Sequence, residues 1–193
     1  MRRINDIFYS LQGEGRHTGR AAIFLRFAGC NRSCSFCDTL FDSYEEMTDE
    51  EILHRISSYA SRFVVLTGGE PTLQVDESFI DLLHQHGYEV AMETNGSNPL
   101  PRNLDWSTVS PKGKTVVTRC NELKVIFTAQ DQQQFSSLQL NPQGIVADYY
   151  YLQPCDTGDS ERNQAIITAC IAYIQQHPQW RLSLQTHKLI GFK

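Results

Sequence analysis

Three cysteines lie close together in one short stretch of the chain. Cys30, Cys34 and Cys37 have the spacing C-x3-C-x2-C within AGCNRSCSFCDTLFD, and the next cysteine is Cys120. Such close spacing lets a single loop wrap around one inorganic centre. Zinc would need a fourth protein ligand, most often from a second cysteine or histidine pair, and no such pair is present in the sequence. Three thiolates are therefore what the loop supplies.

A [4Fe–4S] cluster suits this incomplete ligand set. Three cysteines can hold such a cluster while its fourth iron takes an exogenous ligand, which makes the site both Lewis-acidic and redox-active. The alternative is a zinc site closed by Asp38 or by a histidine. Cys170 lies in the apolar stretch IITACIAYI and is expected to be a small buried hydrophobe.

A glycine-rich turn forms the second motif. VVLTGGEPTL, residues 64–73, follows a predicted buried strand about thirty residues beyond the cysteine loop. Gly68 and Gly69 let the backbone approach a ligand closely and adopt positive φ. Glu70 and exposed backbone groups can meet an ammonium group. A lone GGEP is only a turn, but its place after a buried strand and about thirty residues beyond the cysteine loop makes it a strong signal.

Composition excludes several classes of partner. Seventeen Lys and Arg against 22 Asp and Glu give a net charge of −5 without a basic run, so nucleic-acid binding is not expected. MRRINDIFYSLQGEG lacks the apolar stretch of a signal peptide, and no window approaches the roughly 20 apolar residues of a membrane span. A cytoplasmic protein is expected, in which clustered thiols stay reduced and bind metal rather than form disulfides.

Strands and helices alternate along the chain, which we expect to form one domain over residues 1–193. The predicted strands are Ala22–Phe27, Phe63–Thr67, Tyr88–Glu93, Val109 with its neighbours, Glu122–Phe127, Tyr149–Gln153 and Arg181–Thr186. The predicted helices are Asp49–Arg62, with Thr48 or Asp49 as N-cap, Asp76–Gln85, Gln130–Leu138 and Glu161–Gln176.

This alternation predicts an α/β fold built on a mostly parallel sheet. The stretches 93–109 and 109–122 are too short and too rich in Pro, Gly and Asn for full helices. A closed (β/α)8 barrel usually needs about 250 residues. We therefore expect a partial, open (β/α) barrel with some crossover helices missing.

Several predicted strands carry polar residues on one face, because side chains alternate along a strand. These are Glu122 with Lys124, Ser183 with Gln185 and His187, and, each opposite apolar neighbours, Arg26 and Glu93. Since a purely structural barrel fills its interior with branched apolar side chains, repeated polar faces favour a ligand-filled cavity. A sheet with one solvated face is the alternative.

Together, the two motifs resemble the radical S-adenosylmethionine (AdoMet) superfamily, which has an aromatic residue where Phe36 stands. In that superfamily the amino and carboxylate groups of AdoMet complete the cluster. Nearly the whole chain, including FYSLQGEG, CDT, ETNG, VSPK, ELKVI, YLQP and LSLQTHK, resembles the 7-carboxy-7-deazaguanine synthase family. The resemblance implies conversion of 6-carboxy-5,6,7,8-tetrahydropterin to 7-carboxy-7-deazaguanine with loss of ammonia, in queuosine and 7-deazapurine biosynthesis. It further implies Mg2+, a homodimer, and a flavodoxin- or ferredoxin-like electron donor.

The resemblance also implies a role for individual residues. Cluster ligands would be Cys30, Cys34 and Cys37, and the Mg2+ ligand Thr39, whose alternative is an ordinary turn hydroxyl. Pterin contacts would be Gln12, Glu14, Arg26, Thr67 and His187. AdoMet contacts would be Gly69, Glu70, Glu93, Asn95, Ser110 and Lys112. Without the family, QGEG is simply a solvated turn.

Two other functions remain as alternatives. A small radical AdoMet activase that places a glycyl radical on a partner protein would share the cluster and the compact size, but would not need QGEG, CDT and QTHK. A non-catalytic metal-binding module, structural or redox-sensing, would hold about one zinc and no sulfide.

Overall fold

The computed structural model describes residues 1–34, 37, 43–128, 140–141 and 143–193. Nine strands form one sheet in the order β3-β1-β2-β4-β5-β6-β7-β8-β9. From β2 onward all neighbouring strands run parallel, whereas β1 is antiparallel to both β2 and β3. The strands are β1 (Arg2–Leu11), β2 (Ala21–Phe27), β3 (Glu45–Met47), β4 (Phe63–Gly68), β5 (Glu89–Thr94), β6 (Trp106–Val109), β7 (Arg119–Phe127), β8 (Val146–Pro154) and β9 (Trp180–Leu182).

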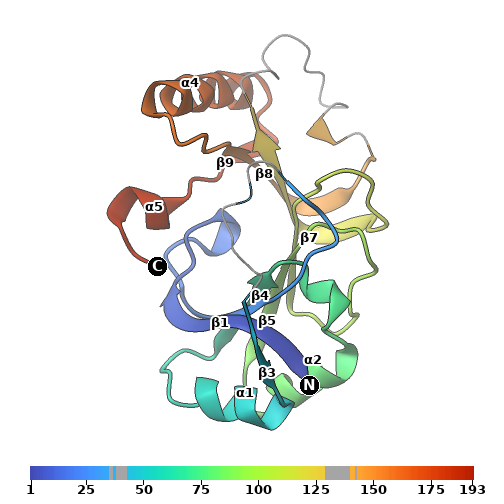
Figure 1. Cartoon of the computed structure of the whole chain (residues 1–193). Helices are drawn as coiled ribbons and strands as arrows, with labels where there is room; N and C mark the ends of the chain where they lie inside the picture. Colours follow the sequence, from blue (N-terminus) through green and yellow to red (C-terminus); the bar gives the residue numbers. More distant parts are fainter. Residues whose placement is uncertain (35–36, 38–42, 129–139, 142) are drawn as a thin grey trace.

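Helices cover the sheet unevenly (Figure 1). They are α1 (Asp49–Ile56), α2 (Glu77–Gln85), α4 (Ser160–Gln176) and α5 (Thr186–Ile190), with the short 3-10 turns η1 (Gly15–His17) and η2 (Pro71–Leu73). Residues 95–105 and 110–118, which are all described, contain no helix. The expected open barrel with missing crossover helices is confirmed. None of the helices in the described part of the chain combines the length and apolarity that a membrane span requires.

Alternation along β2 divides the apolar residues between two faces. Ile23 and Leu25 join α1 and α2 in one fully buried core, because alternate side chains of a strand point to the same side. Ala22 and Phe24 belong to a smaller cluster on the opposite face. A third core lies between α4 and strands β7 to β9. The polar residues Arg26, Thr67 and Glu93 lie on the same strands and the same face as this smaller apolar cluster.

The structure differs from the predicted elements at two strands in the first quarter of the chain, at the end of α1 and at the last predicted strand. Strands β1 and β3 were not expected, and α1 ends at Ile56 rather than at Arg62. The predicted strand Arg181–Thr186 is confirmed at Arg181 and Leu182 but wrong beyond them, because β9 (Trp180–Leu182) ends there and Thr186 begins α5. The predicted helix Gln130–Leu138 lies outside the described residues.

Candidate active site

A large cavity opens on the polar face of the sheet, at the carboxyl ends of the parallel strands. Its volume is about 1030 Å³, at the upper end of the roughly 300–1,000 Å³ usual for ligand sites. Thirteen of the fourteen described residues that the sequence predicted as site residues line it; Glu70 is the exception. The cavity is large enough to hold two small molecules side by side.

The cysteine loop forms one wall of this cavity. Cys30, Cys34 and Cys37 all line it, and the Arg32 amide donates to the Cys30 sulfur over 3.4 Å. Burial, followed by nearby negative charge, raises the pKa of the Cys30 thiol, which the Arg32 amide partly opposes. Among the described residues, no three Cys, His, Asp or Glu side chains lie close enough together to hold one metal ion. A cluster takes one thiolate at each of several iron corners rather than three at one point, so three cysteines lining one cavity are a donor set of the right kind for it. Phe36, Asp38 and Thr39 lie outside the described residues.

The GGEP turn packs directly against the start of the cysteine loop. The Gly69 amide donates to the Phe27 carbonyl and the Glu70 amide to the Gly29 carbonyl, each over 2.9 Å. A Cβ on Gly69 would lie 1.8 Å from the Gly29 carbonyl oxygen, and Gly68 has φ +118°. Glycine is therefore required at both positions, because the backbone of the GGEP turn lies directly against the backbone of residues 27–30. The position of each motif depends on the other.

The Glu70 side chain lies outside the cavity wall. It is fully buried, and its carboxylate accepts hydrogen bonds from the amide and hydroxyl of Thr72, the hydroxyl of Thr94 and the amide of Asn95, at 2.6–3.1 Å. The expectation that this carboxylate meets a ligand ammonium is therefore replaced by another role. Glu70 ties the GGEP turn to the end of β5, and Gly68 and Gly69 are the residues of this motif that line the cavity.

The end of β5 is also tied to the cysteine loop. The Asn95 side chain lines the cavity and donates to Asn31 Oδ1 over 3.0 Å, while Asn31 Nδ2 donates to the Ser97 hydroxyl over 2.7 Å. On the next strand connection, Lys112 Nζ donates to Ser110 Oγ over 2.6 Å. Burial, followed by repulsion from Lys124, lowers the pKa of Lys112 to about 8.

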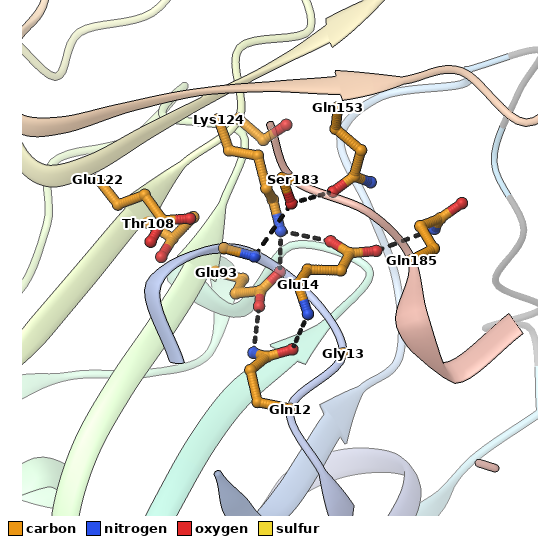
Figure 2. Close-up of polar contacts among 12 residues, drawn as sticks. Gln12, Gly13, Glu14, Glu93, Thr108, Glu122, Lys124, Gln153, Ser183 and Gln185 are labelled. Atoms are coloured by element: carbon orange, nitrogen blue, oxygen red, sulfur yellow. Dashed lines mark hydrogen bonds and ion pairs between the residues drawn. The ribbon is translucent and has the colours of Figure 1, made fainter. Parts of the chain in front are cut away.

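The QGEG segment joins β1 to η1 and directs Gln12 and Glu14 into the cavity (Figure 2). The Glu14 amide donates to Gln12 Oε1 over 3.1 Å, and Gln12 Nε2 donates to Glu93 Oε1 over 2.8 Å. Gln185 Nε2 donates to Glu14 Oε1 over 2.9 Å, and Lys124 Nζ contacts Glu14 Oε2. QGEG is thus held in place by side chains from distant segments rather than left as a solvated turn.

Charge keeps Glu14 ionised despite its burial. Desolvation alone would raise its pKa, but the Lys124 ammonium and the hydrogen bonds from Lys124 and Gln185 together lower the pKa of Glu14 to about 2. Each carboxylate oxygen has two lone-pair directions, and each already accepts one bond. Glu14 can therefore still accept hydrogen bonds from a donor edge of a ligand in the cavity.

Lys124 and Glu122 share one face of β7, as the alternation predicted, but were not expected to be site residues. Lys124 lines the cavity and is 3% exposed. Glu122 lies behind the QGEG segment, where its carboxylate accepts from the Arg16 amide over 2.9 Å. Burial raises the pKa of Glu122 to about 7. The alternation of ELKVIF was the sequence signal that could have found Lys124.

Arg26 and Thr67 lie side by side on paired positions of β2 and β4, and both line the cavity. Next to them, the rings of Phe8 and Phe24 stack with centroids 4.8 Å apart, and the Arg26 guanidinium lies over Phe8. This part of the wall therefore combines an apolar aromatic surface with a cation, which suits a flat ligand that carries an anionic group.

Residues in and before α5 lie against the QGEG segment, and several of them line the cavity (α5 is labelled in Figure 1). Thr186 donates its amide and hydroxyl to the Gly13 carbonyl over 3.0 and 2.9 Å, and a Cβ on Gly13 would lie 2.2 Å from His187 Nδ1. Ser183, Gln185 and His187 do not share a strand face, because β9 ends before them. Ser183 accepts from the Gly15 amide instead, and His187 reaches the cavity from α5.

Known proteins resemble this chain over its full length. The Radical SAM superfamily model matches residues 25–106. A 7-carboxy-7-deazaguanine synthase of Bacteroides thetaiotaomicron is 50% identical, with all of both chains covered. One of Bradyrhizobium diazoefficiens is 41% identical and covers 98% of each. The crystal structure of QueE from Escherichia coli superposes with a TM-score of 0.74 at 30% identity, covering 95% of this chain and 93% of that one. On sequence and structure alike, the chain belongs to the 7-carboxy-7-deazaguanine synthase family of radical AdoMet enzymes.

Proposed function

We propose that this protein converts 6-carboxy-5,6,7,8-tetrahydropterin to 7-carboxy-7-deazaguanine with loss of ammonia. The proposal rests on one observation within the molecule. The same cavity is lined by three cysteines and by Glu14, a largely buried carboxylate whose pKa is lowered to about 2. A pyrimidinone ring with a 2-amino group presents adjacent N–H donors, and a carboxylate is the acceptor that pairs with such an edge.

The pterin would lie between QGEG and the aromatic wall. Glu14 and Gln12 would bind the 2-amino-pyrimidinone edge, and Thr67 would contact the ring. Arg26 would pair with the carboxylate substituent through its planar fork, with His187 closing the site from α5. Firm orientation matters here because a primary carbon radical attacks whichever C–H bond is held against it.

Cys30, Cys34 and Cys37 would hold a [4Fe–4S] cluster, and AdoMet would bind between that cluster and the ends of β5 and β6. When bound, the cluster and AdoMet would supply the radical chemistry that the reaction at C6 of the pterin requires. On the protein side, Gly69 would approach the methionine amino group through its backbone, Glu93 or Asn95 the ribose hydroxyls, and Ser110 with Lys112 the methionine carboxylate.

Three further parts of the proposal rest on the family resemblance. Thr39 would supply a hydroxyl oxygen to Mg2+, a hard cation that keeps several waters and would take its remaining ligand from the substrate carboxylate. The chain would act as a homodimer. A flavodoxin- or ferredoxin-like protein would deliver the electron. Omitting Mg2+ from the assay, together with a Thr39→Val variant, tests the metal assignment.

The test is anaerobic turnover with mass detection, using reconstituted protein, AdoMet, dithionite and the carboxytetrahydropterin. Glu14→Gln keeps the side-chain shape but removes the charge-assisted hydrogen bonds, which are worth roughly 1.5–3 kcal/mol, so kcat/KM should fall by about 10- to 150-fold. Glu50→Gln, an exposed position on α1, is the matched control and should match the parent. Absence of the deazaguanine from a preparation with a full cluster would overturn the proposed substrate.

A further inference from the structure

One buried cation connects the two halves of the cavity. Lys124 Nζ contacts Glu14 Oε2 and lies 3.1 Å from Glu93 Oε2, and Glu122 acts on the same ammonium through its charge (Figure 2). Glu14 comes from the segment after β1, Glu93 from β5 and Lys124 from β7. We refer to Lys124, Glu14, Glu93, Glu122 and Gln12 as the Lys124 cluster.

A second connection closes the Lys124 cluster into a ring. Gln12 Nε2 donates to the Glu93 oxygen that Lys124 does not contact, and Gln12 Oε1 accepts from the Glu14 amide. Glu14 and Glu93 are therefore joined twice, once by charge through Lys124 and once by hydrogen bonds through Gln12. A displacement of either carboxylate is transmitted to the other through contacts of 3.1 Å or less.

The charge balance of the Lys124 cluster makes these positions interdependent. The Lys124 ammonium contacts the carboxylates of Glu14 and Glu93 and is also influenced by the charge of Glu122, and Lys124 is 3% exposed, so water does not screen it well. Glu14 and Glu93 retain side-chain exposures of 15% and 25%, on the cavity side. A ligand that donates hydrogen bonds to one of these carboxylates competes with Lys124 for its negative charge. The contact between Lys124 and the second carboxylate changes as a result.

We propose that Lys124 is a positioning residue that couples pterin binding to AdoMet binding, by holding Glu14 and Glu93 in one buried charge cluster. This inference rests on the function proposed above, in which Glu14 contacts the pterin and Glu93 contacts AdoMet. Lys124 itself need not touch either ligand. Once AdoMet fixes Glu93, Lys124 and Glu14 are already placed for the pterin, so each ligand tightens the binding of the other.

The test measures binding rather than turnover. Without a reductant the AdoMet is not cleaved, so calorimetry on the cluster-loaded protein gives the Kd of 6-carboxy-5,6,7,8-tetrahydropterin with and without saturating AdoMet. We expect AdoMet to tighten pterin binding by about 5- to 150-fold, the usual range for coupled sites, and the reverse titration must give the same factor. Lys124→Met should bring this factor close to one, whereas Lys124→Arg, which keeps the charge, should retain part of it. Arg119→Met removes an exposed cation from the same strand and should keep the parent factor.

A pH series separates positioning from a merely structural role. In Lys124→Met, Glu14 loses the cation that contacts it. His187, Gln185 and the more distant Lys112 remain, with Glu93 and Glu122 nearby, so pterin binding should weaken on acidification at a higher pH than in the parent. A structural role would lower thermal stability without moving this pH limb or the coupling factor.

The outcomes distinguish the two proposals. Equal pterin affinities with and without AdoMet in the parent protein overturn the coupling, and this result does not require Lys124→Met to fold. If the parent still forms the deazaguanine, the proposed function stands. A coupling factor that survives in folded Lys124→Met also overturns the proposed coupling through Lys124. Failure of the pterin to bind at all overturns both.

Discussion

Replacing Gly69 with alanine should separate the two sequence motifs that build the site. The added Cβ would lie 1.8 Å from the Gly29 carbonyl oxygen, 2.4 Å from its carbonyl carbon and 3.1 Å from the Cys30 amide, all backbone atoms. Ordinary contact begins at 3.4 Å, so the start of the cysteine loop must move away. The hydrogen bond from the Glu70 amide to the Gly29 carbonyl would be lost with that movement.

The magnitude follows from these contacts. Overpacking against atoms that cannot rotate away costs about 1–3 kcal/mol, and the lost hydrogen bond adds about 1 kcal/mol. Gly69→Ala should therefore lower the free energy of unfolding by about 2–4 kcal/mol. With a urea m-value of roughly 2 kcal/mol/M, the midpoint should fall by about 1–2 M. Because Cys30 follows Gly29 directly, iron and sulfide bound after reconstitution should fall as well.

A matched control isolates the clash. Gly87 has φ +77° with nothing within 4 Å of an added Cβ, so Gly87→Ala carries only the backbone penalty of about 1 kcal/mol and should bind iron as the parent does. Urea unfolding and iron determination on the three proteins complete the experiment. A Gly69→Ala protein with the parent midpoint and a full iron content would refute the reasoning that each motif fixes the other.

Two further predictions concern stability. Native Glu122, with its pKa near 7 against an ordinary 4.5, binds more protons than the unfolded chain between these pH values, so its contribution to stability is present at low pH and lost as pH rises. Glu122→Gln should therefore exceed the parent by about 1–3 kcal/mol in urea unfolding at pH 8 and lose that advantage at pH 5; an unchanged difference at both pH values contradicts this. Thr48→Ala removes a capping box in which Thr48 and Glu51 bond reciprocally, and should lower Tm by about 2–4 °C, whereas Thr168→Ala in the middle of α4 should not lower it.

Local chemistry made parts of the fold predictable. Thr48 caps α1 as expected, and the alternation of ELKVIF correctly put Glu122 and Lys124 on the face away from the core. The end of α1 was harder, because the periodic pattern continues after Ile56. There the hydroxyls of Ser57 and Ser58 bond to the carbonyls three residues earlier, which ends the helix locally.

Long-range contacts explain what the sequence did not predict. RLSLQTHK alternates like a strand, yet Thr186 bonds to Gly13 and a helix begins there, so a partner 173 residues away decides the local conformation. The buried position of Glu70 has the same origin, since two of its four hydrogen bonds come from Thr94 and Asn95, which only the tertiary fold brings next to it. Motifs and the family resemblance located residues that line the cavity, but they did not predict that Glu70 is buried away from it or that Lys124 lines it.

The bond between Thr186 and Gly13 has a consequence for how the enzyme matures. On the ribosome, the cysteine loop and the GGEP turn emerge well before α5, which follows all nine strands of the described sheet in the sequence. We therefore expect a nascent chain to form the cysteine wall before α5 is available to pack against QGEG. Proteolytic removal of α5 from the folded protein should leave a form that still binds iron but no longer binds the pterin.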